Sequence, residues 1–142
     1  MIALFLAAAL VAQSPPPEAA WTWTLYADAQ PVVLANEILD TASLRTTLEC
    51  DRGTNIVRLT LYGGAPLTGM ARVTAGDASA VAEASTTRTR SARLALRSDH
   101  PVFAAFAVDG RMAIAVGDRH RPVEVPVAHL AKLRRFTELC AG

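Results

Sequence analysis

The sequence has few of the residues that build catalytic and metal centres. Its 142 residues include two cysteines and three histidines, and the histidines lack the spacing of a metal site. There is no Cys-x-x-Cys pair, Gly-x-Ser-x-Gly turn, Walker loop or Gly-x-Gly-x-x-Gly turn. These absences argue against thioredoxin-like redox chemistry and against the common serine hydrolase and nucleotide-binding motifs. No metal and no cofactor is predicted.

The chain also has little net charge and few aromatic side chains. The formal net charge is +1, and aromatic residues make up 6% of the chain. Because the aromatics are not interleaved with the arginines, nucleic-acid binding is not expected. The charge is uneven, with eight acids against four arginines in residues 1–85 and ten basic residues against five acids in residues 86–142. This asymmetry favours an anionic contact on the later half, and solvated faces are the alternative.

No apolar run is long enough for a membrane-spanning helix. The longest runs from Met1 to Ala12, and about a dozen residues give roughly 18 Å of helix against a hydrocarbon core of about 30 Å. This length is typical of a signal peptide, which we assign to residues 1–13, although no lysine or arginine precedes the run. An uncleaved membrane tether is the alternative. We therefore expect a periplasmic or secreted protein with no transmembrane span in the mature chain.

Prolines separate this segment from the rest of the chain. Residues 14–20 form a Pro-rich spacer, because proline removes backbone donors and restricts φ. Residues 21–142 then form a single globular domain of ordinary size. Over the whole chain 51% of the residues are hydrophobic, which leaves enough apolar side chains for a core in this domain.

The two cysteines, Cys50 and Cys140, are predicted to form a disulfide, because exported proteins fold in an oxidising compartment. The bridge would close a loop of about ninety residues, and the restriction of the unfolded chain corresponds to roughly 4–5 kcal/mol. Two separate buried thiols are the alternative.

Alternation of apolar and polar residues predicts most of the strands. In residues 43–50 the inward face carries Leu44, Leu48 and Cys50, which leaves Arg45 on the outward face with its polar neighbours. The turn at residues 51–54 makes this strand and the next the best hairpin of the chain. The segments expected as strands are residues 21–26, 43–50, 55–62, 70–74, 80–84, 93–97, 112–116 and 123–127.

Two helices complete the expected fold. The first begins with Ser98 or Asp99 as its N-cap and Pro101 in its first turn, and it ends at residues 109–110. The second covers residues 128–140, where apolar residues recur at helical spacing. The predicted class is α+β: an antiparallel β-sheet, with a sandwich as one form of it, an internal helix and a C-terminal helix tied back by the disulfide.

Arginines of the later half are the candidates for binding an anionic ligand or partner. Guanidinium groups match the geometry of sulfate, phosphate and carboxylate. The alternative is an exposed strand whose charges prevent edge-to-edge aggregation. Trp21 and Trp23 either stack on a ligand or begin the core. The candidate arginines are Arg88, Arg90, Arg93, Arg97, Arg119 and Arg121.

No catalytic residue is predicted. Ser98, Asp99 and His100 combine the three residue types of a hydrolase triad, but adjacent positions cannot supply the geometry of a triad. Helix capping explains the cluster better.

The later part of the chain resembles a group of known proteins. Residues 99–103 (Asp-His-Pro-Val-Phe), 109–110 (Asp-Gly), 121–126 (Arg-Pro-Val-Glu-Val-Pro) and the final Phe136-x-x-x-Cys140 are similar to short exported proteins of alphaproteobacteria. The resemblance covers mainly residues 98–140. It implies export and a C-terminal helix held by Cys140, and it supplies no catalytic residues.

Two functional hypotheses follow. The first is an exported, non-enzymatic domain that binds a protein or an anionic glycan or lipid of the envelope. The second is a small periplasmic hydrolase or an enzyme inhibitor. A hydrolase would gather polar groups from distant segments in a concave pocket, for instance His100 or His120 with an acid, whereas a binding module would present a flat basic or aromatic surface.

Overall fold

A computed structural model describes residue 14 and residues 16–142, so the predicted signal peptide, residues 1–13, lies outside the described residues. The described chain forms nine strands, two α-helices and two 3-10 helices. The first 3-10 helix occupies the last three residues of the predicted spacer. In chain order the elements are η1 (Glu18–Ala20), β1 (Trp21–Tyr26), β2 (Val32–Ile38), β3 (Leu44–Cys50), β4 (Ile56–Leu61), β5 (Gly69–Ala75), β6 (Ala78–Thr86), β7 (Ala92–Arg97), α1 (Pro101–Asp109), β8 (Arg111–Val116), β9 (Arg119–Glu124), η2 (Val127–His129) and α2 (Leu130–Cys140).

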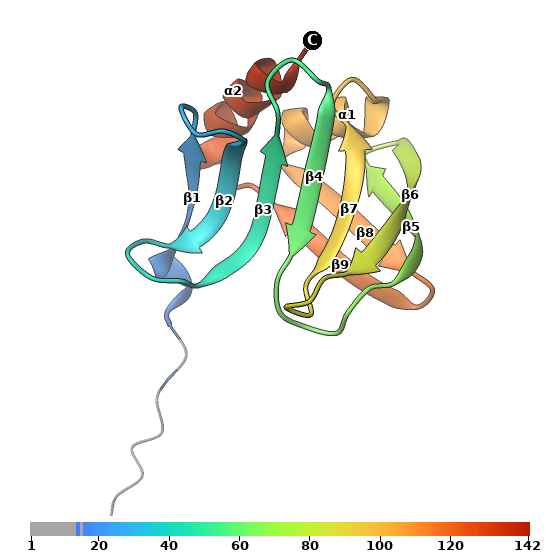
Figure 1. The fold of residues 1–142 in the computed structure, drawn as a ribbon, viewed down its shortest axis with the longest axis horizontal. Coiled ribbons are helices and arrows are strands. Elements are labelled where there is room, and N and C mark those ends of the chain that lie inside the picture. The colour runs from blue at the N-terminus through green and yellow to red at the C-terminus, as the bar shows by residue number, and fades with distance from the viewer. Residues whose placement is uncertain (1–13, 15) are drawn as a thin grey trace, which may run out of the picture.

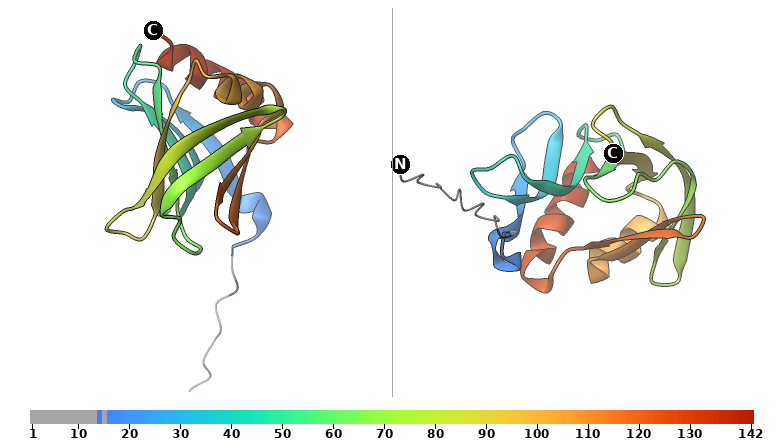
Figure 2. Two further views of the ribbon diagram at one scale, coloured as in Figure 1. Left: turned by 90° about the vertical axis from the view of Figure 1, so that its right-hand side faces the viewer. Right: turned by 90° about the horizontal axis from the view of Figure 1, so that it is seen from below.

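The strands form one antiparallel sheet in the order β1-β2-β3-β4-β7-β6-β5-β8-β9. The sheet curls strongly around the core, as the view from below shows (Figure 2). A side chain links its two outermost strands, because Nε1 of Trp23 in β1 donates a hydrogen bond to the carbonyl oxygen of Glu124 in β9 at 3.1 Å. We call the region between β1 and β9 the seam.

Both α-helices lie at one end of the curled sheet (Figure 1). α1 packs against β5, β6 and β8, and α2 packs against α1, β1 and β2. Phe103 and Phe106 of α1 and Phe136 of α2 are fully buried. The predicted α+β class, an antiparallel sheet with an internal and a C-terminal helix, is confirmed.

A row of leucines across neighbouring strands forms the centre of the core. Leu25, Leu34, Leu48, Leu59 and Leu94 stand opposite one another from β1 through β4 to β7. The last four are at most 3% exposed. Period-two alternation directs these side chains to the concave face of the sheet, as the sequence pattern predicts for β3 and β4.

The predicted disulfide is present and holds the last turn of α2 against the end of β3. Cys50 and Cys140 are bonded, with their Cα atoms 5.9 Å apart. Two backbone hydrogen bonds support the same junction: Gly53 N–H donates to the carbonyl of Leu139 at 3.3 Å, and Asn55 N–H donates to that of Cys140 at 2.8 Å. The chain end is therefore joined to the β3–β4 turn by three links.

Several local expectations are wrong. The last strand, β9, covers Arg119–Glu124 and not residues 123–127, because Val116 already pairs with Arg119 across a short turn. The strand β2 was not predicted, because the run from Val32 to Ala35 is continuously apolar and lacks alternation. The N-cap of α1 is His100, whose Nδ1 accepts a hydrogen bond from Val102 N–H at 3.0 Å. Asp99, an expected cap, instead forms an ion pair with Arg97 at 2.8 Å.

In the part of the chain that the structure describes, no helix is long and apolar enough to span a membrane.

Candidate functional site

A cavity of about 500 Å³ lies at the seam, within the usual range of small-molecule sites, roughly 300–1,000 Å³. We call it the seam cavity. Strand β1 contributes the aromatic residues Trp21 and Trp23, and Tyr62 follows β4. Trp23 is 3% exposed and belongs to the core, which is one of the two roles predicted for the tryptophans, and both Trp21 and Trp23 line the cavity.

The seam cavity begins where polar residues replace the leucine row. Asn36 lies two residues after Leu34 on β2. It stands directly opposite Trp23 of β1 on one side and Thr46 of β3 on the other. Asn36 and Thr46 line the cavity. The Asn36 side-chain oxygen, Oδ1, is buried and has no hydrogen-bond partner among the described residues. Such an oxygen costs about 1–3 kcal/mol when left unpaired.

Arg45 lies in the seam cavity and not on the outward face of β3, so the predicted orientation is wrong. The β2–β3 register shifts after Asn36, which pairs with Thr46, to Glu37, which pairs with Leu44. Arg45 is the extra residue, and a bulge of this kind redirects a side chain. Its guanidinium carbon lies 4.0 Å from the ring centroid of Trp21.

The arginines at the seam cavity are paired or hydrogen-bonded. Arg45 donates two hydrogen bonds to the carboxylate of Glu18, at 2.6 and 2.8 Å, and this guanidinium lowers the pKa of the Glu18 carboxyl. Arg121 donates to the backbone carbonyls of Gly63 at 2.7 Å and Tyr62 at 3.0 Å. The arginines thus hold η1 and the β4–β5 loop against the cavity.

His129 lines the far side of the seam cavity. Nζ of Lys132 lies 2.7 Å from the carbonyl oxygen of Trp23 and 3.2 Å from Nδ1 of His129. An ammonium group has only donors, so Nδ1 accepts and the imidazole proton is on Nε2. Burial, and secondarily the charge of Lys132, lower the pKa of His129.

The lowered pKa of His129 predicts a pH dependence of stability. The unfolded chain binds a proton at His129 near its ordinary pKa of about 6.5, whereas the folded protein resists protonation. The free energy of unfolding is therefore highest above this pH and falls as the pH is lowered below it. Urea unfolding of the wild type and of His129→Gln between pH 7.5 and 5 measures the effect.

We expect the wild type to lose more stability than His129→Gln over this interval. The exposed carboxyls of Glu18 and Asp99 also have lowered pKa values, because each is hydrogen-bonded to an arginine. Their effect begins nearer pH 4, the ordinary range of carboxyls, about 3.9–4.3. Parallel profiles for the two proteins between pH 7.5 and 5 would contradict the assignment to His129.

The structure distributes the predicted arginines over separate elements. Arg93 and Arg97 lie on β7, and Arg119 and Arg121 on β9, with three strands between β7 and β9 in the sheet order. Arg119 donates to the carbonyl of Pro66 at 2.8 Å. The two arginines of β9 therefore bind the β4–β5 loop, and the six side chains do not form one patch.

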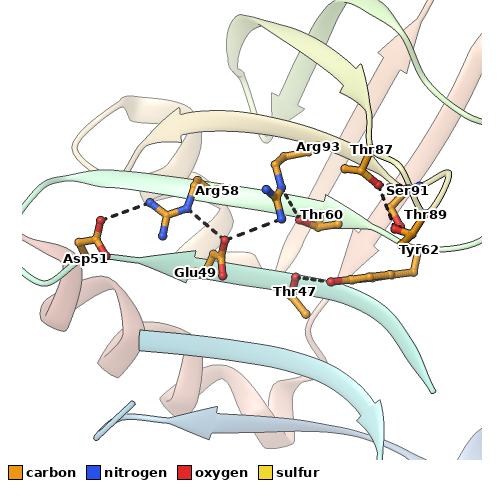
Figure 3. Close-up of polar contacts among 10 residues, drawn as sticks. All are labelled: Thr47, Glu49, Asp51, Arg58, Thr60, Tyr62, Thr87, Thr89, Ser91 and Arg93. Atoms are coloured by element: carbon orange, nitrogen blue, oxygen red, sulfur yellow. Dashed lines mark hydrogen bonds and ion pairs between the residues drawn. The ribbon is translucent and has the colours of Figure 1, made fainter. Parts of the chain in front are cut away.

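The outer face of β3, β4 and β7 carries the network drawn in Figure 3. Nε of Arg58 donates to Glu49 at 3.1 Å, and Arg93 lies 4.0 Å from the same carboxylate. Nε of Arg93 also donates to Thr60 Oγ1 at 3.3 Å. Exposed ion pairs of this kind contribute little to stability, typically about 0–1 kcal/mol. Because Arg58 and Arg93 both lie next to Glu49, their charges are partly neutralised and less available to an anionic ligand.

Arg88 and Arg90 differ from the other four candidates. Both are exposed in the turn between β6 and β7. Among the ion pairs of the described residues, none includes either of them. The side-chain hydroxyls of this turn are hydrogen-bonded in a row, Thr87 to Thr89 and Thr89 to Ser91 (Figure 3).

The histidines do not pair with acids. Within residues 14 and 16–142, no hydrogen bond or ion pair joins His100, His120 or His129 to a carboxylate. The same residues contain no cluster of side chains suited to a metal ion. His129 lines the seam cavity together with Glu18 and Glu124, and no hydrogen bond among the described residues joins it to either carboxylate.

Sequence reasoning did not predict Asn36, Arg45 or Thr46 as site residues. Asn36 belongs to the strand that was missed, and the bulge at Arg45 has no glycine or proline to indicate it. The signal that could have been noticed is Asn36 two positions after Leu34, on the same inward face, because a polar side chain on such a face needs a hydrogen-bond partner.

The site and fold thus define an α+β domain with a mixed aromatic and polar cavity at the seam of a curled sheet. In comparisons with known proteins, no family model, no curated protein and no solved structure matches this chain.

Proposed function

We propose that this chain is an exported, non-enzymatic domain that binds a component of the cell envelope, and that the seam cavity is its ligand site. The observation that carries the proposal is Asn36, whose Oδ1 is buried and unpaired beside a cavity of about 500 Å³. Buried polar groups nearly always have a hydrogen-bond partner. If the amide turns toward the cavity, a ligand can supply a partner and remove the cost of leaving this oxygen unpaired.

Location in the periplasm or outside the cell is part of the same proposal. The apolar segment Met1–Ala12 supports export, since its length is typical of a signal peptide. The disulfide between Cys50 and Cys140 supports it independently, because such bonds persist mainly in oxidising compartments.

A second contact, with an anionic envelope component, is supported by the exposed turn that carries Arg88 and Arg90. Their guanidinium groups make no ion pair with the other described residues, so they are available to a phosphate or carboxylate group. This contact would orient the domain on the envelope and leave the seam cavity open.

Site-specific crosslinking tests the proposal. A photoreactive amino acid replaces Glu124, which lines the seam cavity, or, as a control, Glu83, which is exposed on β6. The full chain is illuminated in its native envelope, and adducts are identified by intact mass. We expect a discrete adduct from position 124 and none of the same mass from position 83. The same adducts from both positions, or none from position 124, would refute the proposal.

A further inference from the structure

From its lining we infer that the seam cavity takes an uncharged saccharide, a sugar ring of an envelope glycan. This inference deepens the proposed function and rests on it. Three features of the lining narrow the ligand to this class: its charge, its hydrogen-bonding groups and its aromatic surface.

The charges of the lining are balanced. Two arginines, Arg45 and Arg121, face two glutamates, Glu18 and Glu124. Arg45 is committed to Glu18 through two hydrogen bonds, and Arg121 to two backbone carbonyls of the β4–β5 loop. An anionic ligand would find no spare guanidinium here, and burying an unpaired charge is costly. The charges of the lining therefore argue against an anionic ligand.

The hydrogen-bonding groups favour hydroxyls. Asn36 offers a carbonyl oxygen and an amide nitrogen on one side chain, and rotation of the amide exchanges the two at the cavity wall. A hydroxyl both donates and accepts, so it satisfies either orientation. Thr46 and His129 line the same space, and their side chains carry further groups of both kinds. A ligand with several hydroxyls matches this set.

The remaining lining is aromatic. Trp21, Trp23 and Tyr62 line the cavity, and aromatic rings pack against apolar faces of a ligand. Arg45 stacks on Trp21 at 4.0 Å and fixes the orientation of this indole. A pyranose has a C–H face between its hydroxyls, so one molecule uses both the aromatic and the polar parts of the cavity.

Intrinsic fluorescence of the full chain measures binding directly, because the only two tryptophans of the sequence both line the seam cavity. The uncharged probes are N,N′-diacetylchitobiose, maltose and lactose. The charged probe is digalacturonic acid, and trialanine tests the peptide alternative. We expect a saturable change in emission with at least one uncharged disaccharide, at an affinity about tenfold or more above that for the acid and the peptide.

Asn36→Leu separates a binding role from a structural one. This variant is expected to weaken saccharide binding at least tenfold and yet to raise the Tm by a few degrees, because it removes an unpaired buried oxygen. Thr46→Val should also weaken binding, and it tests the site independently if Asn36→Leu fails to fold. Thr22→Val is the control and should bind like the wild type. Thr22 lies between Trp21 and Trp23 on β1, so its side chain is on the other face of the strand.

Each other outcome overturns the inference. Equal or tighter binding of the acid or the peptide would show that the ligand class is wrong. No binding of any uncharged disaccharide, together with an adduct at position 124, would refute the saccharide and leave the proposed function standing. Absence of both would refute both. Undiminished affinity in folded Asn36→Leu and Thr46→Val would place the ligand elsewhere.

Discussion

Replacing Cys50 and Cys140 together with alanine is expected to lower the free energy of unfolding by about 4 kcal/mol. The bridge joins residues 90 positions apart, and closing a loop of this size restricts the unfolded chain by roughly 4–5 kcal/mol in the chain-entropy model. Both residues are 0% exposed, so the loss of the sulfur atoms from the core adds to the effect. For a domain of this length the Tm should fall by roughly 12 °C.

The loss should be concentrated at the end of α2. Gly53 and Asn55 donate backbone hydrogen bonds to the carbonyls of Leu139 and Cys140, and these bonds lose their covalent support in the double variant. Amide hydrogen exchange at Gly53 and Asn55 should therefore accelerate more than exchange at Leu59, in the middle of β4.

Thermal unfolding of the wild type with and without reductant provides the control. The reduced wild type should resemble the double alanine variant in Tm. If the reduced wild type or the double variant had a Tm within about 3 °C of that of the oxidised protein, the structural role of the bridge would be contradicted. Uniform acceleration of amide exchange throughout the sheet would contradict it as well.

The parts of the fold that the sequence predicts are those governed by local patterns. Alternation over β4 and over β3 beyond its bulge at Arg45, the turn between them, and the apolar stripe of α2 are confirmed. β2 was missed because its first half, Val32–Ala35, is buried on both faces and therefore carries no alternation. This is expected of a strand whose outward side is also partly covered.

The candidate site was not predictable in the same way, because it depends on contacts distant in sequence. Trp23 and Glu124, which join β1 to β9, are 101 residues apart. Arg121 reaches Tyr62 across 59 residues. Arg119 and Arg121 were predicted as candidates for binding an anion or a partner. Local spacing does not reveal that they bind loop carbonyls, or that a bulge turns Arg45 onto Trp21.

Gly110→Ala is expected to destabilise the protein by about 3–4 kcal/mol. Gly110 ends α1 with φ +74°, a left-handed conformation that costs a residue with a side chain roughly 1–2 kcal/mol. An added Cβ would also lie 2.2 Å from the carbonyl oxygen of Val125 and 2.8 Å from Cδ2 of Leu130. The carbonyl belongs to the backbone and cannot rotate away, so the chain itself must move, at a further cost of about 1–3 kcal/mol.

Two hydrogen bonds explain why this movement is resisted. Gly110 N–H donates to the carbonyl of Phe106, and Gly110 O accepts from Val125 N–H, both at 2.7 Å. They hold the end of α1 against the segment that leads from β9 into η2 and α2. Displacing Gly110 therefore disturbs both helices and the seam, so the variant should also accelerate amide exchange at Val125.

Gly117→Ala is the matched control for this prediction. Gly117 also has a positive φ, +58°, but no atom lies within 4 Å of an added Cβ. Its substitution should cost only the backbone term, roughly 1–2 kcal/mol. Chemical unfolding of the two variants thus separates conformational strain from the clash with Val125. Equal destabilisation would show that the close approach of Gly110 to Val125 contributes nothing, and that β9 and α2 are held in place without it.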